Sequence, residues 1–282
     1  MKLVSFAFFS DPTPHPGLLV GDELLDLTPL GVPDTIGAIA VGPTALRQAL
    51  EMPDASRIAL SGVRLLAPLP RPPRIFCVGL NYRDHAVESK MEIPKVPTFF
   101  LKLPSAVIGP EETVRIPAMT QQPDYEVELA LVIGKAGRDI PKENWRDHVF
   151  GYMILNDVSA RDVQLATSQW TLGKSFDTFC PIGPAIVTGD EIPDPHALDI
   201  RLSISGEILQ HSNTRELIFK APDLIAYLSS ITALEPGDII STGTPAGVGL
   251  GRTPRRWLQP GETMVAEVEG LGQLINPVGA GS

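Results

Sequence analysis

Short apolar runs, separated by turns rich in glycine and proline, recur along this chain of 282 residues, which holds 25 glycines and 28 prolines. Such runs between turn residues are typical of β-strands, and too few helical patterns lie between them for an alternating βαβ design. The pattern predicts an α+β, β-rich protein with a closed or folded-over sheet. The expected strands span residues 2–8, 17–20, 23–27, 63–67, 74–78, 98–101, 126–133, 150–156, 185–188, 200–204, 238–242 and 264–268, and the expected helices span 44–51, 81–88, 142–147, 159–166 and 221–230.

A proline-rich stretch divides the chain. Four of the six residues in 68–73 are proline, and such a run favours an extended, semi-rigid connector. We therefore expect a small N-terminal α+β domain over residues 1–67, a linker over 68–73 and a larger catalytic domain over 74–282.

The charge of the chain limits its partners. A formal net charge of −10 argues against nucleic acid and anionic membrane surfaces, which both require a basic face. Small anionic substrates stay possible if a local cation attracts them. No apolar stretch approaches the roughly 18 to 20 residues of a membrane span. The apolar N-terminal run ends at Asp11, too early for a signal peptide, and is interpreted as the first strand.

The two cysteines, Cys77 and Cys180, each lie among apolar residues. This setting favours buried, reduced thiols over a disulfide or a nucleophile. A reducing compartment follows, and we expect the cytoplasm.

Two glutamates stand in a segment that otherwise resembles a buried strand. Because side chains alternate along a strand, Glu126 and Glu128 should share one face while Tyr125, Val127 and Leu129 occupy the other. Carboxylates that are close together in apolar surroundings repel each other unless a positive charge lies between them. Oxygen ligands suit Mg²⁺, Mn²⁺ or Ca²⁺, whereas Zn²⁺ usually recruits histidine or cysteine. The alternative is a solvated edge strand.

A histidine and a glutamate lie one turn apart in the predicted helix over 81–88. There His85 and Glu88 can touch, and a carboxylate against one ring nitrogen raises the basicity of the other, as a general base requires. The alternative is an ordinary polar pair on a surface helix.

Four more polar residues are candidates for contact with substrate or charge stabilisation. Arg161 and Gln164 follow Asp157 by less than two helical turns and can hold a carboxylate or carbonyl. The alternative for Arg161 is a structural pair with an acid of the protein. Lys174, among apolar and small residues, either reaches water or is held inward by anions, where it would stabilise a developing enolate. Thr244 lies in a glycine-rich loop that lacks the ending of a P-loop, and it either cradles a carboxylate or belongs to a plain turn.

Five motifs together resemble the fumarylacetoacetate hydrolase (FAH) superfamily. They are Gly-Leu-Asn-Tyr-Arg-Asp-His at 79–85, Asp-Tyr-Glu-Val-Glu-Leu at 124–129, Asn-Asp-Val-Ser-Ala-Arg-Asp-Val-Gln at 156–164, Gly-Lys-Ser-Phe-Asp-Thr-Phe at 173–179 and Ser-Thr-Gly-Thr-Pro-Ala-Gly-Val-Gly at 241–249. The resemblance is strongest to the fumarylacetoacetate hydrolase domain-containing protein 2 group and related prokaryotic members. It implies a mixed β-roll with a small N-terminal domain, a homodimer, and bound Mg²⁺ or Mn²⁺, with Ca²⁺ as a possible substitute in a crystal.

The resemblance also assigns roles to residues. It implies that Glu126, Glu128 and Asp157 bind the metal, that His85 and Glu88 form the base, that Lys174 assists electrostatically, and that Arg161, Gln164 and Thr244 contact the substrate. An additional acidic ligand of the tyrosine-catabolic enzyme is replaced here by Val78, as in the members with three carboxylates.

These roles predict a metal-dependent enzyme that acts on a small 2-oxo acid or 1,3-dicarbonyl acid through an enolate held at the cation. The first expectation is hydrolytic cleavage of a carbon–carbon bond in an acylpyruvate, a fumarylpyruvate or a diketo acid. Oxaloacetate tautomerisation or decarboxylation, or dienoate isomerisation, are alternatives, because these reactions share the intermediate. A non-catalytic, metal-stabilised binding protein is a further alternative.

Overall fold

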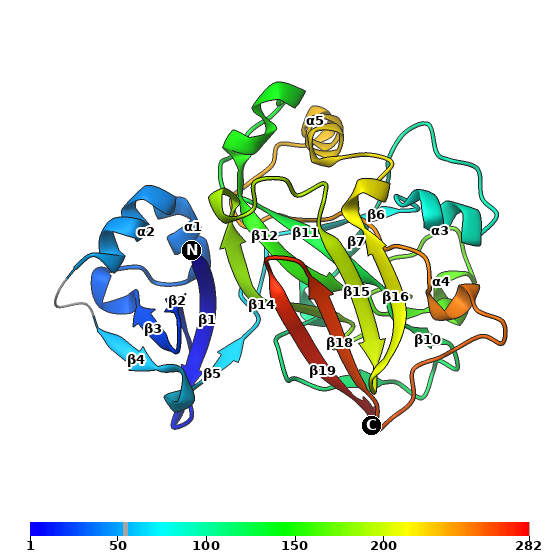
Figure 1. The fold of residues 1–282 in the computed structure, drawn as a ribbon, viewed down its shortest axis with the longest axis horizontal. Coiled ribbons are helices and arrows are strands. Elements are labelled where there is room, and N and C mark those ends of the chain that lie inside the picture. The colour runs from blue at the N-terminus through cyan, green and yellow to red at the C-terminus, as the bar shows by residue number, and fades with distance from the viewer. Residues whose placement is uncertain (53–55, 282) are drawn as a thin grey trace.

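Twelve strands form one sheet in the computed structural model, which describes residues 1–52 and 56–281. Its main path runs β4 (Arg57–Ala59), β3 (Glu23–Asp26), β2 (Asp11–Val20), β1 (Lys2–Phe8), β14 (Cys180–Thr188), β12 (Val149–Asn156), β11 (Val127–Ile133), β17 (Ile239–Ser241), β6 (Ile75–Gly79) and β7 (Thr98–Lys102), while β5 (Val63–Leu66) also pairs with β1 and β8 (Val107–Ile108) with β14. The sheet thus crosses from the N-terminal segment into the rest of the chain (Figure 1).

A second sheet packs against the middle of the first. It contains β16 (Glu207–Asn213), β15 (Asp199–Ile204), β18 (Thr263–Val268), β19 (Gly272–Ala280) and β9 (Val114–Ile116), and a two-stranded pair joins β10 (Pro123–Asp124) to β13 (Ser159–Ala160). Figure 1 shows the second sheet in front of β11 and β12. The predicted β-rich α+β class and the folded-over sheet are confirmed.

Helices are short and lie around the sheets. They are α1 (Thr35–Val41), α2 (Pro43–Leu50), α3 (Arg83–Glu88), α4 (Arg161–Gln164) and α5 (Ala221–Ile231), with 3₁₀ turns that include η4 (Lys142–His148) and η7 (Gly249–Gly251). The longest, α5, has Pro222 in its first turn, where the missing N–H is not needed, and buries Leu224, Ile225 and Leu228.

Strict alternation in and beside β11 builds two cores. Tyr125, Val127 and Leu129 enter the core between the two sheets, whereas Ala130 and Val132 enter the core on the opposite face, which also contains residues of β1, β12 and β14. Because the side-chain period of a strand is two, this register turns the even-numbered acids away from the inter-sheet core.

Several elements differ from the sequence-based expectation. The predicted helix at 142–147 is the 3₁₀ turn η4, and the one at 159–166 starts only at Arg161, because residues 159–160 pair with residues 123–124 instead. Strands β16 and β19 and helix α1 were not expected. Their sequences are polar or interrupted by glycine and proline, so that their placement depends on tertiary packing.

The N-terminal segment is joined to the rest of the chain by main-chain pairing as well as by the predicted linker at 68–73. Strand β1 runs antiparallel to β14, with Lys2 opposite Val187 and Leu3 opposite Ile186. The domain limits stay a prediction, and Ser282, at the end of the predicted catalytic domain, lies outside the described residues.

Both cysteines are buried and free, as expected. Burial raises the pKa of Cys77 well above its ordinary value and that of Cys180 to about 12, so both thiols stay protonated near neutral pH.

Candidate active site

Three predicted metal ligands meet at the ends of two paired strands. Glu126, Glu128 and Asp157 are buried, and each offers a carboxylate oxygen within 4.8 Å of the other two. Antiparallel pairing of β11 with β12 brings them together, since the Asp157 N–H donates to the Glu126 carbonyl at 2.8 Å. Glu126 itself precedes β11 by one residue, yet it keeps the alternation expected from the sequence.

Among the residues that the structure describes, Glu128 has only neutral hydrogen-bond donors. Its Oε2 accepts from the Ser241 hydroxyl at 2.5 Å and from the Gly243 N–H at 2.9 Å. Burial, and then the nearby charges of Asp157 and Glu126, raise the pKa of Glu128 well above its ordinary value. A positive charge beside this carboxyl group would favour its ionised form.

Lys174 lies between the other two acids. Its Nζ is 2.6 Å from Glu126 Oε2 and 2.7 Å from Asp157 Oδ2, so the lysine is held inward by anions, one of the two alternatives posed by the sequence. Burial disfavours the Lys174 ammonium, but Asp157 and Glu126 outweigh it and raise the pKa of Lys174 above its ordinary value. Burial likewise disfavours the ionised form of Glu126. The positive charges of Arg161 and Lys174 outweigh this effect and lower the pKa of Glu126 to about 2.

Lys102, at the end of β7, is a site residue that sequence reasoning missed. This buried ammonium lies 2.6 Å from Asp157 Oδ1, 3.1 Å from the Val158 carbonyl and in contact with the Lys174 carbonyl. The only local signal is a lysine directly after the predicted strand at 98–101.

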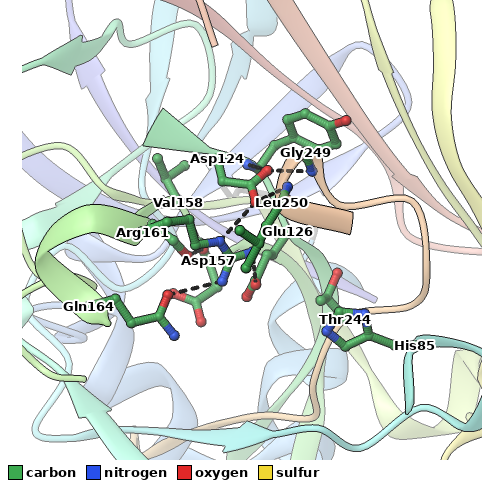
Figure 2. Close-up of polar contacts among 12 residues, drawn as sticks. His85, Asp124, Glu126, Asp157, Val158, Arg161, Gln164, Thr244, Gly249 and Leu250 are labelled. Atoms are coloured by element: carbon green, nitrogen blue, oxygen red, sulfur yellow. Dashed lines mark hydrogen bonds and ion pairs between the residues drawn. The ribbon is translucent and has the colours of Figure 1, made fainter. Parts of the chain in front are cut away.

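Arg161 pairs with acids of the protein itself. Its Nε donates to Asp124 at 2.8 Å, its Nη2 to Glu126 at 2.5 Å and its Nη1 to the Gln164 side-chain oxygen at 3.0 Å (Figure 2). Asp124, also missed, accepts from the Gly249 and Leu250 N–H groups as well. This geometry is the internal pairing that the sequence left open for Arg161, and contact of Arg161 or Gln164 with substrate stays a prediction.

The predicted histidine–glutamate pair is formed on α3. His85 Nδ1 lies 3.1 Å from Glu88 Oε2, while Glu88 Oε1 accepts from the Gly247 N–H at 2.9 Å. Gly251 packs so closely that a Cβ there would lie 2.5 Å from Glu88 Cδ. The glycine-rich loop thereby fixes the carboxylate that orients His85.

Thr244 is engaged within the protein. Its hydroxyl donates to the Val127 carbonyl at 2.9 Å and accepts from the Gln210 amide at 2.8 Å. In Figure 2 the Thr244 and His85 side chains lie on one side of the site and Gln164 on the other. Binding of substrate by Thr244 stays a prediction.

One cavity joins these groups. It has a volume of about 480 Å³, and its wall contains Glu126, Glu128, His85, Glu88 and Lys174, together with Arg161, Gln164, Thr244 and Arg255. The remainder is largely apolar and includes Met91, Phe100, Leu165, Trp170, Val248 and Leu250. Pockets with an apolar wall and a few convergent polar groups are typical of small-molecule sites.

The acid cluster fits a divalent cation. Its donors are oxygens only, which suits a hard ion, and Glu128 has no cationic partner among residues 1–52 and 56–281. Glu126, Glu128 and Asp157 are the residues that would hold such an ion.

The fold and the site define the class of this protein. It is a β-rich protein with a folded-over mixed sheet and a candidate hard-metal centre, two of whose three acids line a cavity beside a histidine–carboxylate pair. The chain belongs to the fumarylacetoacetate hydrolase family, since the model for the fumarylacetoacetate (FAA) hydrolase C-terminal domain matches residues 74–279.

Known proteins resemble the whole chain. The mitochondrial oxaloacetate tautomerase fahd2 of Xenopus laevis is 43% identical over 287 residues, covering 99% of this chain and 90% of its own. Among solved structures, the fumarylacetoacetate hydrolase of Exiguobacterium antarcticum is 38% identical with a TM-score of 0.86, and the maleylpyruvate hydrolase of Sphingobium sp. SYK-6, in complex with manganese and pyruvate, is 34% identical with a TM-score of 0.84. Both structural matches cover 100% of each chain.

Within residues 1–52 and 56–281, no helix has the length and apolar character that crossing a membrane requires. The cytoplasmic location expected from the sequence stays a prediction, and the Xenopus relative is named as mitochondrial.

Proposed function

We propose that this protein is an oxaloacetate tautomerase that uses Mg²⁺ or Mn²⁺. The observation that carries the proposal is the opening of the His85–Glu88 pair into the cavity that also exposes Glu126 and Glu128. The similarity over nearly the full chain to a protein named oxaloacetate tautomerase supports the choice of reaction. Tautomerisation was one of the alternatives expected from the sequence, whereas hydrolysis was the first expectation.

The chain's own residues supply the proton chemistry. Because Glu88 accepts the Nδ1 proton of His85, the other ring nitrogen, Nε2, keeps its lone pair and acts as the base. His85 Nε2 removes a proton from C3 of the keto form and returns one to the C2 oxygen, and the reverse sequence converts enol to keto. Glu126, Glu128 and Asp157 would hold a divalent cation, which would supply Lewis-acid stabilisation of negative charge on the substrate. Lys174 adds a fixed positive charge beside two of these acids.

Hydrolysis of an acylpyruvate is the second candidate. It is favoured by the likeness to a maleylpyruvate hydrolase solved with manganese and pyruvate. In that reaction His85 would take a proton from water, which attacks the remote carbonyl, and pyruvate would leave as its enolate. The same base therefore serves either reaction, and the substrate decides between them. The non-catalytic alternative is disfavoured because the candidate base and lysine are both in place.

The direct test follows the ultraviolet absorbance of the oxaloacetate enol after mixing with the protein and Mg²⁺ or EDTA. Acetylpyruvate, fumarylpyruvate and a dienoate are assayed in parallel, with products identified. We expect enol–keto conversion of oxaloacetate, without carbon–carbon cleavage or loss of CO₂, that EDTA abolishes. Rapid cleavage of an acylpyruvate with no effect on oxaloacetate would replace the tautomerase with the hydrolase.

His85→Ala tests the base. Proton transfer by a positioned side chain contributes roughly 10²- to 10⁴-fold, so kcat should fall by this factor. Calorimetry with Mn²⁺ is the control, because His85 is not among the proposed ligands and the affinity should not change. Full activity of His85→Ala would remove this residue from the mechanism.

We also propose a homodimer. Large apolar side chains are exposed along residues 87–103 and 165–172, namely Val87, Met91, Ile93, Val96, Leu101, Leu103, Leu165 and Leu172. Apolar surface of this kind marks contact sites in proteins that do not enter membranes. Light scattering with size-exclusion chromatography measures the mass directly, and a mass of one chain would contradict the dimer.

A further inference from the structure

Most cations around the cavity are already neutralised by the protein. Arg161 is bound to Asp124 and Glu126, and Lys174 to Glu126 and Asp157. These pairs leave little capacity to attract an anion. Arg255 also lines the cavity, and its exposed side chain has no ion pair or hydrogen bond to residues 1–52 or 56–281.

The loop that carries Arg255 is firmly anchored. Upstream of Arg255, the N–H groups of Gly249 and Leu250 donate to the buried Asp124 carboxylate at 2.7 and 3.0 Å. Arg252 donates to the Gly247 carbonyl at 3.2 Å and to the Leu209 carbonyl at 2.5 Å.

The downstream side of the loop is fixed in the same way. The Arg256 N–H donates to the Gly249 carbonyl at 3.1 Å, its guanidinium pairs with Glu262, and the Leu258 N–H donates to the Pro123 carbonyl at 2.9 Å. Arg252 and Arg256 therefore have structural partners, and Arg255 alone of the three offers its charge to the cavity. Because the loop backbone is already ordered, ligand binding would have to order only the Arg255 side chain.

We infer that Arg255 is a specificity-determining residue that binds the distal carboxylate of a 2-oxo dicarboxylate. A planar guanidinium matches a carboxylate in bidentate geometry, and an unpaired cation offsets the repulsion between an anionic substrate and a chain of net charge −10. The inference deepens the proposed function, on which it rests for the other end of the substrate: the 2-oxo acid end lies at the acid cluster, and the second carboxylate lies at Arg255.

The test is a cycle with two matched ligands and two protein forms. Calorimetry measures binding of 2-oxoglutarate and of 2-oxopentanoate, which replaces the distal carboxylate by a methyl group, to the Mn²⁺-loaded full chain. Arg255→Ala should weaken 2-oxoglutarate by roughly 10- to 100-fold and leave 2-oxopentanoate unchanged, and Arg255→Lys should retain part of the affinity. Arg71→Ala removes an exposed guanidinium outside the cavity wall and should change neither ligand.

Three results would overturn the inference. They are equal weakening of both ligands by Arg255→Ala, no weakening of either ligand, and a wild type that does not prefer 2-oxoglutarate to 2-oxopentanoate. Kinetics with oxaloacetate distinguish failure of the Arg255 site from failure of the proposed tautomerase activity. If the cycle shows coupling but the wild type does not tautomerise oxaloacetate, the tautomerase fails and the Arg255 site stands. If the wild type tautomerises oxaloacetate and Arg255→Ala keeps the same kcat/KM for it, the tautomerase stands and the Arg255 site fails.

Discussion

The Lys102 ammonium lies 2.6 Å from Asp157 Oδ1, and both side chains are fully buried. The Val158 and Lys174 carbonyls accept the remaining two N–H donors of Lys102, so the ammonium is completely satisfied. Asp157 is thereby fixed through one oxygen, while its Oδ2 faces Lys174 at 2.7 Å. The acid cluster is therefore held in position by a cation that does not line the cavity.

Lys102→Met should lower the free energy of unfolding by roughly 3–5 kcal/mol, because it removes one partner of a buried ion pair and leaves Asp157 Oδ1 without a donor, with Lys174 as the remaining cation beside Asp157. Urea denaturation followed by circular dichroism measures the change. Lys95→Met, at an exposed lysine, is the matched control and should have little effect. A change below about 1 kcal/mol in Lys102→Met, the range of surface ion pairs, would mean that the buried pair adds no stability.

Glu128→Gln should abolish stabilisation of the protein by Mn²⁺. At a free ion concentration 100 times the dissociation constant, the wild type should gain about 2.7 kcal/mol of unfolding free energy. The variant lacks one of the three carboxylates and should gain almost nothing. Glu207→Gln, at an exposed acid on β16, should behave as the wild type. Equal Mn²⁺ stabilisation of Glu128→Gln and the wild type would show that Glu128 is not a ligand.

Gly251→Ala should lower kcat by roughly 10- to 100-fold, as expected for a displacement of about 1 Å in a catalytic group. The added Cβ would lie 2.8 Å from Glu88 Oε1 and push this carboxylate away from His85. Mn²⁺ affinity should be retained, because neither Glu88 nor His85 is among the proposed ligands. Gly62→Ala, where no atom lies within 4 Å of the new Cβ, is the control. An unchanged kcat in Gly251→Ala would argue that the position of Glu88 does not matter for His85.

His196 should make stability depend on pH. Its Nε2 accepts from the Ala221 N–H at 3.2 Å, at the start of α5, which requires a neutral Nε2. Burial lowers the pKa of His196 below the ordinary 6.5, against an opposing effect of Asp194. The unfolded chain therefore takes up a proton before the folded one does as the pH falls. This contribution to stability is complete above pH 6.5 and is lost as the pH falls through the lower folded-state pKa.

His196→Phe keeps an aromatic ring and removes the acceptor. It should cost about 1 kcal/mol at pH 7.5 and reduce the loss of stability of the wild type between pH 6.5 and 5. Urea midpoints of both proteins at pH 7.5, 6.5 and 5 give the comparison. Parallel pH dependence in the wild type and the variant would exclude His196 as the titrating group.

Sequence patterns predicted that Glu126 and Glu128 lie together, but they did not predict the contact of Lys102 with Asp157. The period of two in residues 125–129 was sufficient to place Glu126 and Glu128 together, because alternation is a local property. The contact between Lys102 and Asp157 spans 55 residues and depends on how β7 and the end of β12 lie in the folded chain. Nothing in the local sequence around Lys102 reports that contact.

The fold shows the same difference between local patterns, which the sequence reveals, and long-range contacts, which it does not. Apolar strands such as residues 2–8 and 127–133 were identifiable from their composition. By contrast, β19 contains two glycines and a proline, and its position depends on pairing with β18 and β9. Local propensity therefore does not report the strands that tertiary pairing creates.

The pairing of β1 with β14 has a consequence for any shortened form of the protein. Trimming the chain to residues 74–279 would remove the strand that pairs with β14 at Ile186 and Val187, and would strip Leu3 and Leu18 from the apolar core that contains Ile182 and Ile186. An unpaired strand edge beside newly exposed hydrophobic side chains favours pairing with a strand of another molecule, and hence aggregation. The N-terminal segment thus protects the large sheet, which also contains Glu128, against aggregation.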